Sequence, residues 1–223
     1  MNIIERLVSV IAPHVCIGCG VEEDALLCET CRQGQPLVPS RCYRCKAVTE
    51  EYTVCRNCRD TTPLRQVVVY THYQAEAKEL LHRTKYERAK SGTEEMAVMM
   101  AEIAWVFNQT SLLVHIPTAT SRVRARGYDH AKLLTSALSH RTGLRRASLL
   151  ARVGQAHQVG ANRSARLKQL EAAFRAIRMS AVRGRHIVLV DDVLTTGATL
   201  ETAARVLRRA GAASVSAIVF AQA

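Results

Sequence analysis

The chain has 223 residues, 48% of them hydrophobic and only 4% aromatic, and a formal net charge of +12. This length holds one domain of ordinary size and a small additional module. No apolar run approaches the roughly 20 residues that span a bilayer, and the amino-terminal segment lacks a small-residue cleavage site, so we expect a cytoplasmic protein without membrane insertion. The positive charge favours an anionic partner, a polyphosphorylated metabolite or a nucleic acid, although a merely solubilising surface is the plainer interpretation.

Residues 1–60 are expected to form the small module. Apolar residues between positions 3 and 11 fall on one helical face, which predicts a short amphipathic helix packed on its own protein. All eight cysteines follow in this segment as four C-x-x-C pairs. Two such pairs make a tetrahedral zinc site, whereas a disulfide framework would need an oxidising compartment. A segment this short with few large apolar side chains also needs a metal to fold, so we expect two structural zinc ions.

The assignment of cysteines to zinc has two solutions. In the sequential one, one ion takes the first four cysteines and the other takes the last four, which are Cys16, Cys19, Cys28 and Cys31, and Cys42, Cys45, Cys55 and Cys58. An interleaved, cross-braced arrangement uses the same residues. In either case four thiolates leave no open coordination position, so neither zinc is expected to be catalytic.

Residues 61–223 alternate strand-like and helix-like segments. The expected strands are 66–73, 111–117, 147–153, 186–192 and 214–221, and the expected helices are 74–89, 93–109, 129–143 and a last one that ends at Arg209. This alternation predicts an α/β domain with a parallel sheet flanked by helices. Ligands of such sheets bind at the carboxyl ends of the strands.

The stretch VLVDDVLTTGATL, residues 188–200, lies at such a strand end. Side chains alternate along a strand, so Asp191 and Asp192 can serve one ligand only if the chain turns there. The residues that follow would open a helix whose free N–H groups and hydroxyls can hold a phosphate; they are Thr195, Thr196, Gly197, Ala198 and Thr199. The Gly-Lys-Ser/Thr of a P-loop is absent, which disfavours a nucleoside triphosphatase. Carboxylates beside a phosphate cradle suit a sugar phosphate with a vicinal diol.

This stretch resembles the signature of type I phosphoribosyltransferases, which bind 5-phosphoribosyl-1-pyrophosphate (PRPP). The resemblance implies a type I phosphoribosyltransferase-like fold for residues 61–223. It also implies that Asp191 and Asp192 contact the ribose 2- and 3-hydroxyls, that Thr195–Thr199 hold the 5-phosphate, and that Mg²⁺ accompanies PRPP.

Nearly the whole chain is similar to the competence protein ComF family. The similarity rests on the cysteine pairs and on three further segments, LLHRTKYERA (80–89), HIPTATSRVRARGYDHAKLL (115–134) and RVGQAHQVGANRSARLKQLEAAF (152–174). It implies that Lys85, Arg122 and Arg126 lie near the pyrophosphate and that residues 153–168 form a mobile loop over the site. Solvated loop charge is the alternative interpretation of the arginines. The chain departs from the family with His130 in place of the usual Gln and Gln169 in place of the usual Asn.

Three functions remain open at this point. The resemblance implies a cytosolic DNA-uptake factor that binds single-stranded DNA and works with the uptake machinery. The fifteen Lys/Arg against two Asp/Glu in residues 122–185 fit a DNA backbone. A phosphoribosyltransferase acting on an unidentified base is the second, and enzymatic activity stays uncertain because no base-binding hood and no catalytic residue can be recognised. The third is a PRPP-sensing regulator without turnover.

Overall fold

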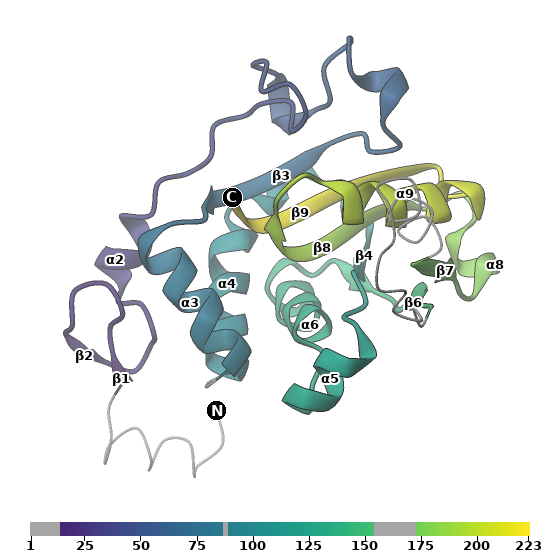
Figure 1. The fold of residues 1–223 in the computed structure, drawn as a ribbon. Helices are drawn as coiled ribbons and strands as arrows, with labels where there is room; N and C mark the ends of the chain where they lie inside the picture. The colour runs from purple at the N-terminus through teal and green to yellow at the C-terminus, as the bar shows by residue number, and fades with distance from the viewer. Residues whose placement is uncertain (1–13, 87–88, 154–172) are drawn as a thin grey trace, which may run out of the picture.

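The protein is described from a computed structural model, which places residues 14–86, 89–153 and 173–223. The helix expected at residues 3–11 and almost all of the loop expected at 153–168 lie outside these ranges. At the centre is a five-stranded, entirely parallel sheet in the order β3-β9-β8-β4-β5 (Figure 1). Its strands are β3 (Val67–His72), β4 (Leu112–His115), β5 (Arg145–Arg146), β8 (His186–Leu194) and β9 (Ser214–Gln222). The predicted α/β architecture is confirmed.

Helices cover both faces of this sheet (Figure 1). They are α3 (Ala75–Tyr86), α4 (Ala89–Ala101), α5 (Thr120–Arg126), α6 (His130–Thr142), α8 (Met179–Val182) and α9 (Ala198–Arg209). Alternate strand residues enter two separate apolar clusters because side chains point to opposite faces in turn. Val188 and Val190 of β8 pack with α3, α4 and α6, whereas Ile187 and Leu189 pack with α9. The continuous apolar run of β8 therefore reflects burial on both faces.

Three expected elements differ from those in the structure. The helix expected at 93–109 begins earlier and ends at Ala101, followed by a short 3₁₀ turn, η3 (Ala104–Val106). The strand expected at 147–153 is only β6 (Leu150–Arg152), which pairs antiparallel with β7 (Phe174–Ala176) outside the main sheet. The strand expected to end at Asp192 continues to Leu194. None of the helices in the described ranges is long and apolar enough to cross a membrane.

The cysteine-containing segments lie against both sides of the sheet. Their regular elements are β1 (His14–Val15), β2 (Glu22–Glu23), α2 (Glu29–Gln33), η1 (Glu50–Tyr52) and η2 (Arg59–Thr61). The first segment contributes Leu26 and Leu27 to the cluster under α3 and α4. The second contributes Val38 and Tyr43 to the cluster under α9. Each half of the module thus completes the core on a different face, while the division at residue 60 stays a prediction.

Candidate functional site

The eight cysteines form two compact groups in sequential order, Cys16 to Cys31 and Cys42 to Cys58. Within each group the four Sγ atoms lie within 4.8 Å of one another. The Sγ atoms of Cys19 and Cys28 are 3.7 Å apart, and those of Cys45 and Cys55 are 3.5 Å apart. A tetrahedral ion with Zn–S bonds of about 2.3 Å separates its sulfurs by about 3.8 Å, so both groups are compatible with structural zinc. The cross-braced alternative does not match this grouping.

The phosphate loop expected at 195–199 lies between the carboxyl end of β8 and the first turn of α9. Gly197, with φ of 79°, is the N-cap and has no side chain to cap the helix, while the Thr196 hydroxyl accepts the N–H of Ala198 at 3.4 Å. Thr195 and Thr196 are exposed, and Thr199 is half-buried. The first N–H groups of α9 and three hydroxyls are therefore presented together at an accessible helix start, where the helix dipole favours an anion.

The two carboxylates do not lie in a turn, as the sequence interpretation required for joint action. They occupy consecutive positions of β8, so their side chains leave opposite faces of the strand. Asp192 is buried and faces α3 and α6, while Asp191 is half-buried and accepts the N–H of Asp192 at 3.0 Å. The chain does not bend at these two residues. Both carboxylates are near residues 195–199 only because β8 ends a few residues later.

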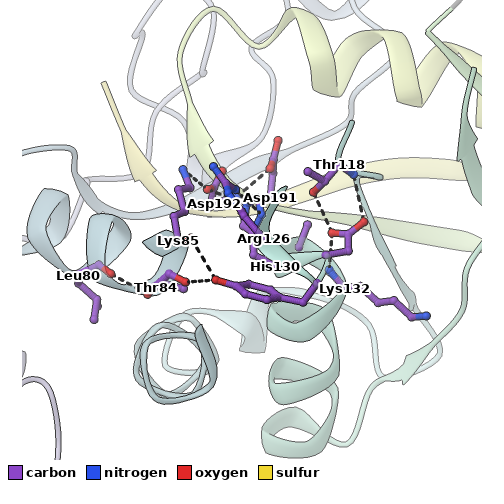
Figure 2. Close-up of polar contacts among 12 residues, drawn as sticks. Leu80, Thr84, Lys85, Thr118, Arg126, His130, Lys132, Asp191 and Asp192 are labelled. Carbon is purple, nitrogen blue, oxygen red and sulfur yellow. Dashed lines mark hydrogen bonds and ion pairs between the residues drawn. The ribbon is translucent and has the colours of Figure 1, made fainter. Parts of the chain in front are cut away.

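Two basic side chains converge on Asp192 (Figure 2). Lys85 Nζ lies 2.5 Å from Asp192 Oδ2, and His130 Nε2 lies 3.0 Å from the same oxygen. Arg126 Nη1 is 3.4 Å from His130 Nδ1. Because an arginine only donates, Nδ1 is the acceptor in that contact, and Nε2 is the nitrogen that contacts Asp192. The carboxylate is thus held by α3 and α6 together.

The ionisation of the two carboxylates differs accordingly. Burial would raise the pKa of Asp192, but the His130 hydrogen bond and the Lys85 ammonium outweigh it and hold that pKa well below its usual range. Burial, and next the negative charge of Asp192, raise the pKa of Asp191 well above its usual range. The pair therefore has one carboxyl whose ionisation is favoured and one whose ionisation is disfavoured.

The three cations expected near the pyrophosphate occupy different positions. Lys85 contacts the carboxylate pair directly, and Arg126 reaches it through His130. Arg122 is exposed on α5, and burial together with the positive charge of Arg122 lowers the pKa of Arg152. Tyr128 donates its hydroxyl to the carbonyl oxygens of Thr84 and Lys85, at 2.9 and 3.1 Å, which fixes the end of α3 that carries the lysine.

Two further residues of the site were not predicted as such. His130 was read only as a departure from the family, although its place one residue after a helix-capping Asp puts it at the start of α6. Arg152 stands over the Phe174 ring at 5.4 Å and lies within electrostatic reach of Asp191. The signal was available, since Arg152 opens the segment 152–174 that carries the family resemblance.

The second cysteine group is wedged against the phosphate loop. A Cβ added at Gly197 would lie 3.0 Å from Cε2 of Tyr43. The Tyr43 hydroxyl donates to Glu201 Oε1 at 2.6 Å, and Thr62 donates to the same hydroxyl at 2.5 Å. Burial and the Glu201 carboxylate raise the pKa of Tyr43, so its hydroxyl stays protonated and can donate. The aromatic ring between two of the cysteines thus supports the first turn of α9.

The chain is similar to several known proteins in sequence or in fold. The family model of the phosphoribosyl transferase domain matches residues 140–223. The chain is 31% identical over 214 residues to competence protein ComFC of Bacillus subtilis, covering 88% of this chain and 84% of that protein. It is 28% identical over 199 residues to the DNA utilization protein YhgH of Escherichia coli K12, covering 85% and 87%. An allosteric regulatory enzyme of purine biosynthesis superposes with a TM-score of 0.45 at 17% identity, covering 61% of this chain and 29% of that one.

Proposed function

The chain belongs to the ComF family of competence proteins, and on that premise we propose that it binds Mg²⁺-PRPP and single-stranded DNA in the cytoplasm during DNA uptake or DNA use. In this proposal residues 1–60 form a module with a structural zinc ion in each cysteine group, and residues 61–223 form the PRPP-binding domain. The names of the relatives, competence protein and DNA utilization protein, support the DNA part.

One observation carries the PRPP part. A helix start whose N-cap is a glycine, with threonine hydroxyls beside it, follows two carboxylates at the end of a strand of the parallel sheet. We assign the phosphate of PRPP to Thr195–Thr199 and the ribose hydroxyls to Asp191 and Asp192. Lys85, which contacts Asp192 in this structure, would also be able to contact the pyrophosphate when PRPP is bound. Oxygens of the pyrophosphate would be ligands of the accompanying Mg²⁺.

Isothermal titration calorimetry with Mg²⁺-PRPP tests this assignment. The wild-type protein is expected to bind, and the Asp191→Asn/Asp192→Asn double variant is expected to lose roughly a hundredfold in affinity, because both carboxyl partners of the ribose hydroxyls are removed, the ionised one included. Asp60→Asn, at an exposed position of the cysteine module, serves as the matched control and should bind like the wild type. Equal binding by the wild type and the double variant would refute the assignment.

The match to the phosphoribosyl transferase domain favours a second candidate function, transfer of phosphoribose to a nitrogenous base. Such a reaction releases pyrophosphate and needs mainly a positioned nucleophile and a stabilised leaving group. The measurement is pyrophosphate release from PRPP across a panel of bases. Release with one base identifies a transferase and its acceptor, whereas binding of PRPP without release on any base identifies a regulatory ligand.

A further inference from the structure

A basic hollow lies at the end of α9 that is remote from the phosphate loop. Its volume is about 760 Å³, within the range of ligand sites. One wall comes from the second cysteine segment and the chain that leads into β3, and the other comes from the last turns of α9 and the start of β9. The lining residues are Thr53, Val54, Arg59, Thr62, Pro63, Leu64, Arg65, Arg205, Arg208, Arg209, Ala213, Ser214 and Val215. We call this hollow the arginine groove.

The charge of the arginine groove is not balanced locally. Five arginines line it, and no acidic residue is among the described lining residues. Arg208 donates to the carbonyl oxygens of Ala212 and Ala213 and so closes the end of α9, and Arg205 pairs with Glu201 at 3.0 Å. These two have structural partners.

The other three arginines have no such role. Arg59, Arg65 and Arg209 are exposed, and within the described ranges no carboxylate forms an ion pair with any of them. Like charges that line one hollow repel one another, so their collection there is unfavourable without an anion. Stability of the fold does not account for them.

The PRPP site does not account for them either. The loop at 195–199 opens α9, whereas Arg209 ends it, and a helix of 12 residues is about 18 Å long. A single PRPP molecule held at the loop therefore does not reach the arginine groove. The groove is a separate anion site that shares one helix with the PRPP site.

We propose that the arginine groove is where the chain holds the phosphodiester backbone of single-stranded DNA. Guanidinium groups suit phosphate because they donate two parallel hydrogen bonds. The described lining residues include no aromatic side chain, so the groove offers no aromatic platform on which bases could stack. Its arginines can bind backbone phosphates of any sequence, so we expect binding that depends mainly on the backbone.

This inference rests on the proposed DNA-binding function and gives it a location different from the basic band at 122–185. None of the lining residues belongs to that band. One wall of the groove is the cysteine module itself, so the groove exists only while the module is folded against α9. The module is then part of the DNA site and not only a support.

The test is a fluorescence anisotropy titration of labelled oligothymidylate with the full chain at several salt concentrations. Arg65→Ala/Arg209→Ala removes two groove charges. Arg145→Ala/Arg146→Ala removes two exposed charges from β5, within the basic band and on an edge strand not adjacent to β9. Circular dichroism melts check that both variants fold, and calorimetry checks that both still bind Mg²⁺-PRPP. Unlabelled tripolyphosphate is titrated as a competitor.

The groove variant is expected to weaken DNA binding by about tenfold and to lower the slope of log K against log salt by about 1.4, while the β5 variant stays near wild type. Loss of binding in the β5 variant alone, or equal loss in both, would overturn the location in the groove. Displacement of the labelled DNA by tripolyphosphate, at a concentration lower than that of the DNA phosphates, is a further contrary result. It would overturn the proposed location in favour of a small polyphosphate as the ligand of the groove. A wild-type protein that binds no DNA at any salt concentration would instead refute the proposed function itself.

Discussion

Asp191 and Asp192 are neighbours in the sequence but differ in burial, partners and charge. Asp192 is buried between Lys85 and His130, and Asp191 is half-buried with a carboxyl whose pKa is raised. At the residue scale the site therefore pairs one carboxylate whose ionisation is favoured by Lys85 and His130 with one carboxyl whose ionisation is disfavoured by burial and by its charged neighbour.

Asparagine at the two positions is expected to have opposite effects on stability at pH 7. The lowered pKa of Asp192 means that its ionised form stabilises the fold above about pH 4, and this contribution is lost as the pH falls through the folded-state pKa. Asp192→Asn should lower the free energy of unfolding by about 1–3 kcal/mol. The raised pKa of Asp191 means that ionisation opposes folding above about pH 4, so Asp191→Asn should raise the free energy of unfolding.

Urea unfolding at pH 7 and pH 4 measures both effects. The difference between each variant and the wild type should shrink at pH 4, where the carboxyls of the unfolded chain are half protonated. If both variants changed stability in the same direction at pH 7, the assignment of charge within the pair would be wrong.

Gly197 is the second position where one residue decides the site. Its φ of 79° is left-handed, and a Cβ there would meet Tyr43. Gly197→Ala is expected to lower the free energy of unfolding by about 1–2 kcal/mol through backbone strain, and by more through the contact with the ring. Gly184→Ala is the matched control, because φ is 69° and nothing lies within 4 Å. In urea unfolding we predict a larger loss of unfolding free energy for Gly197→Ala than for Gly184→Ala, together with weaker PRPP binding by Gly197→Ala. Equal losses would contradict a close contact between Tyr43 and position 197.

At the scale of elements, α9 joins the parts of the molecule that the proposals invoke. Its first two residues belong to the phosphate loop, Glu201 accepts a hydrogen bond from Tyr43 of the second cysteine segment, and its last turn lines the arginine groove. Glu201 is buried and also pairs with Arg205, so the helix and the cysteine segment are fixed to each other through one carboxylate. A shift of α9 on binding PRPP would therefore move the arginines of its last turns that line the arginine groove.

Tyr43→Phe tests this connection. The variant removes the hydroxyl that donates to a buried carboxylate, so we expect the free energy of unfolding to fall by about 1–3 kcal/mol. Tyr73→Phe is the control, because no hydrogen bond to the Tyr73 hydroxyl is recorded among the described residues and the ring is 37% exposed. Urea unfolding measures both. A loss of stability by Tyr73→Phe as large as that by Tyr43→Phe would show that the Glu201 contact has no special weight.

At the scale of the whole molecule, the two cysteine groups are placed on opposite faces of the sheet. Cys16 and Cys28 enter the apolar cluster under α3 and α4, and Cys42 enters the one under α9. Separation of the thiols in either group would thus disturb the packing of the main core and not only unfold a peripheral segment.

Removal of zinc is accordingly expected to destabilise the entire chain. The purified protein should contain about two zinc ions per chain, and Cys42→Ser should reduce this to about one. Chelation should abolish the cooperative thermal transition, since structural zinc supplies folding free energy directly. Elemental analysis and differential scanning calorimetry are the measurements. A transition that persists unchanged in metal-free protein would contradict the structural role.

The sequence predicted most of the sheet because apolar runs such as residues 187–190 are buried on both faces, and it predicted that residues 195–199 lie between a strand end and a helix because these residues are contiguous, while their role in holding a phosphate stays a prediction. It failed where long-range contacts decide. β6 is not part of the main sheet and pairs with β7 instead. The strand that contains Asp191 continues to Leu194 because β9 pairs with it up to that residue. The arginine groove could not be foreseen, since its residues come from two segments separated by about 140 positions.

The most direct test of the account is the anisotropy of labelled single-stranded DNA titrated with the protein, with and without Mg²⁺-PRPP. The wild type and the Asp191→Asn/Asp192→Asn variant are measured side by side. We predict that both proteins bind DNA and that PRPP changes the affinity only in the wild type, because the phosphate loop and the arginine groove share α9. Absence of DNA binding under every condition would contradict the account and leave the search for a phosphoribosyl acceptor as the next step.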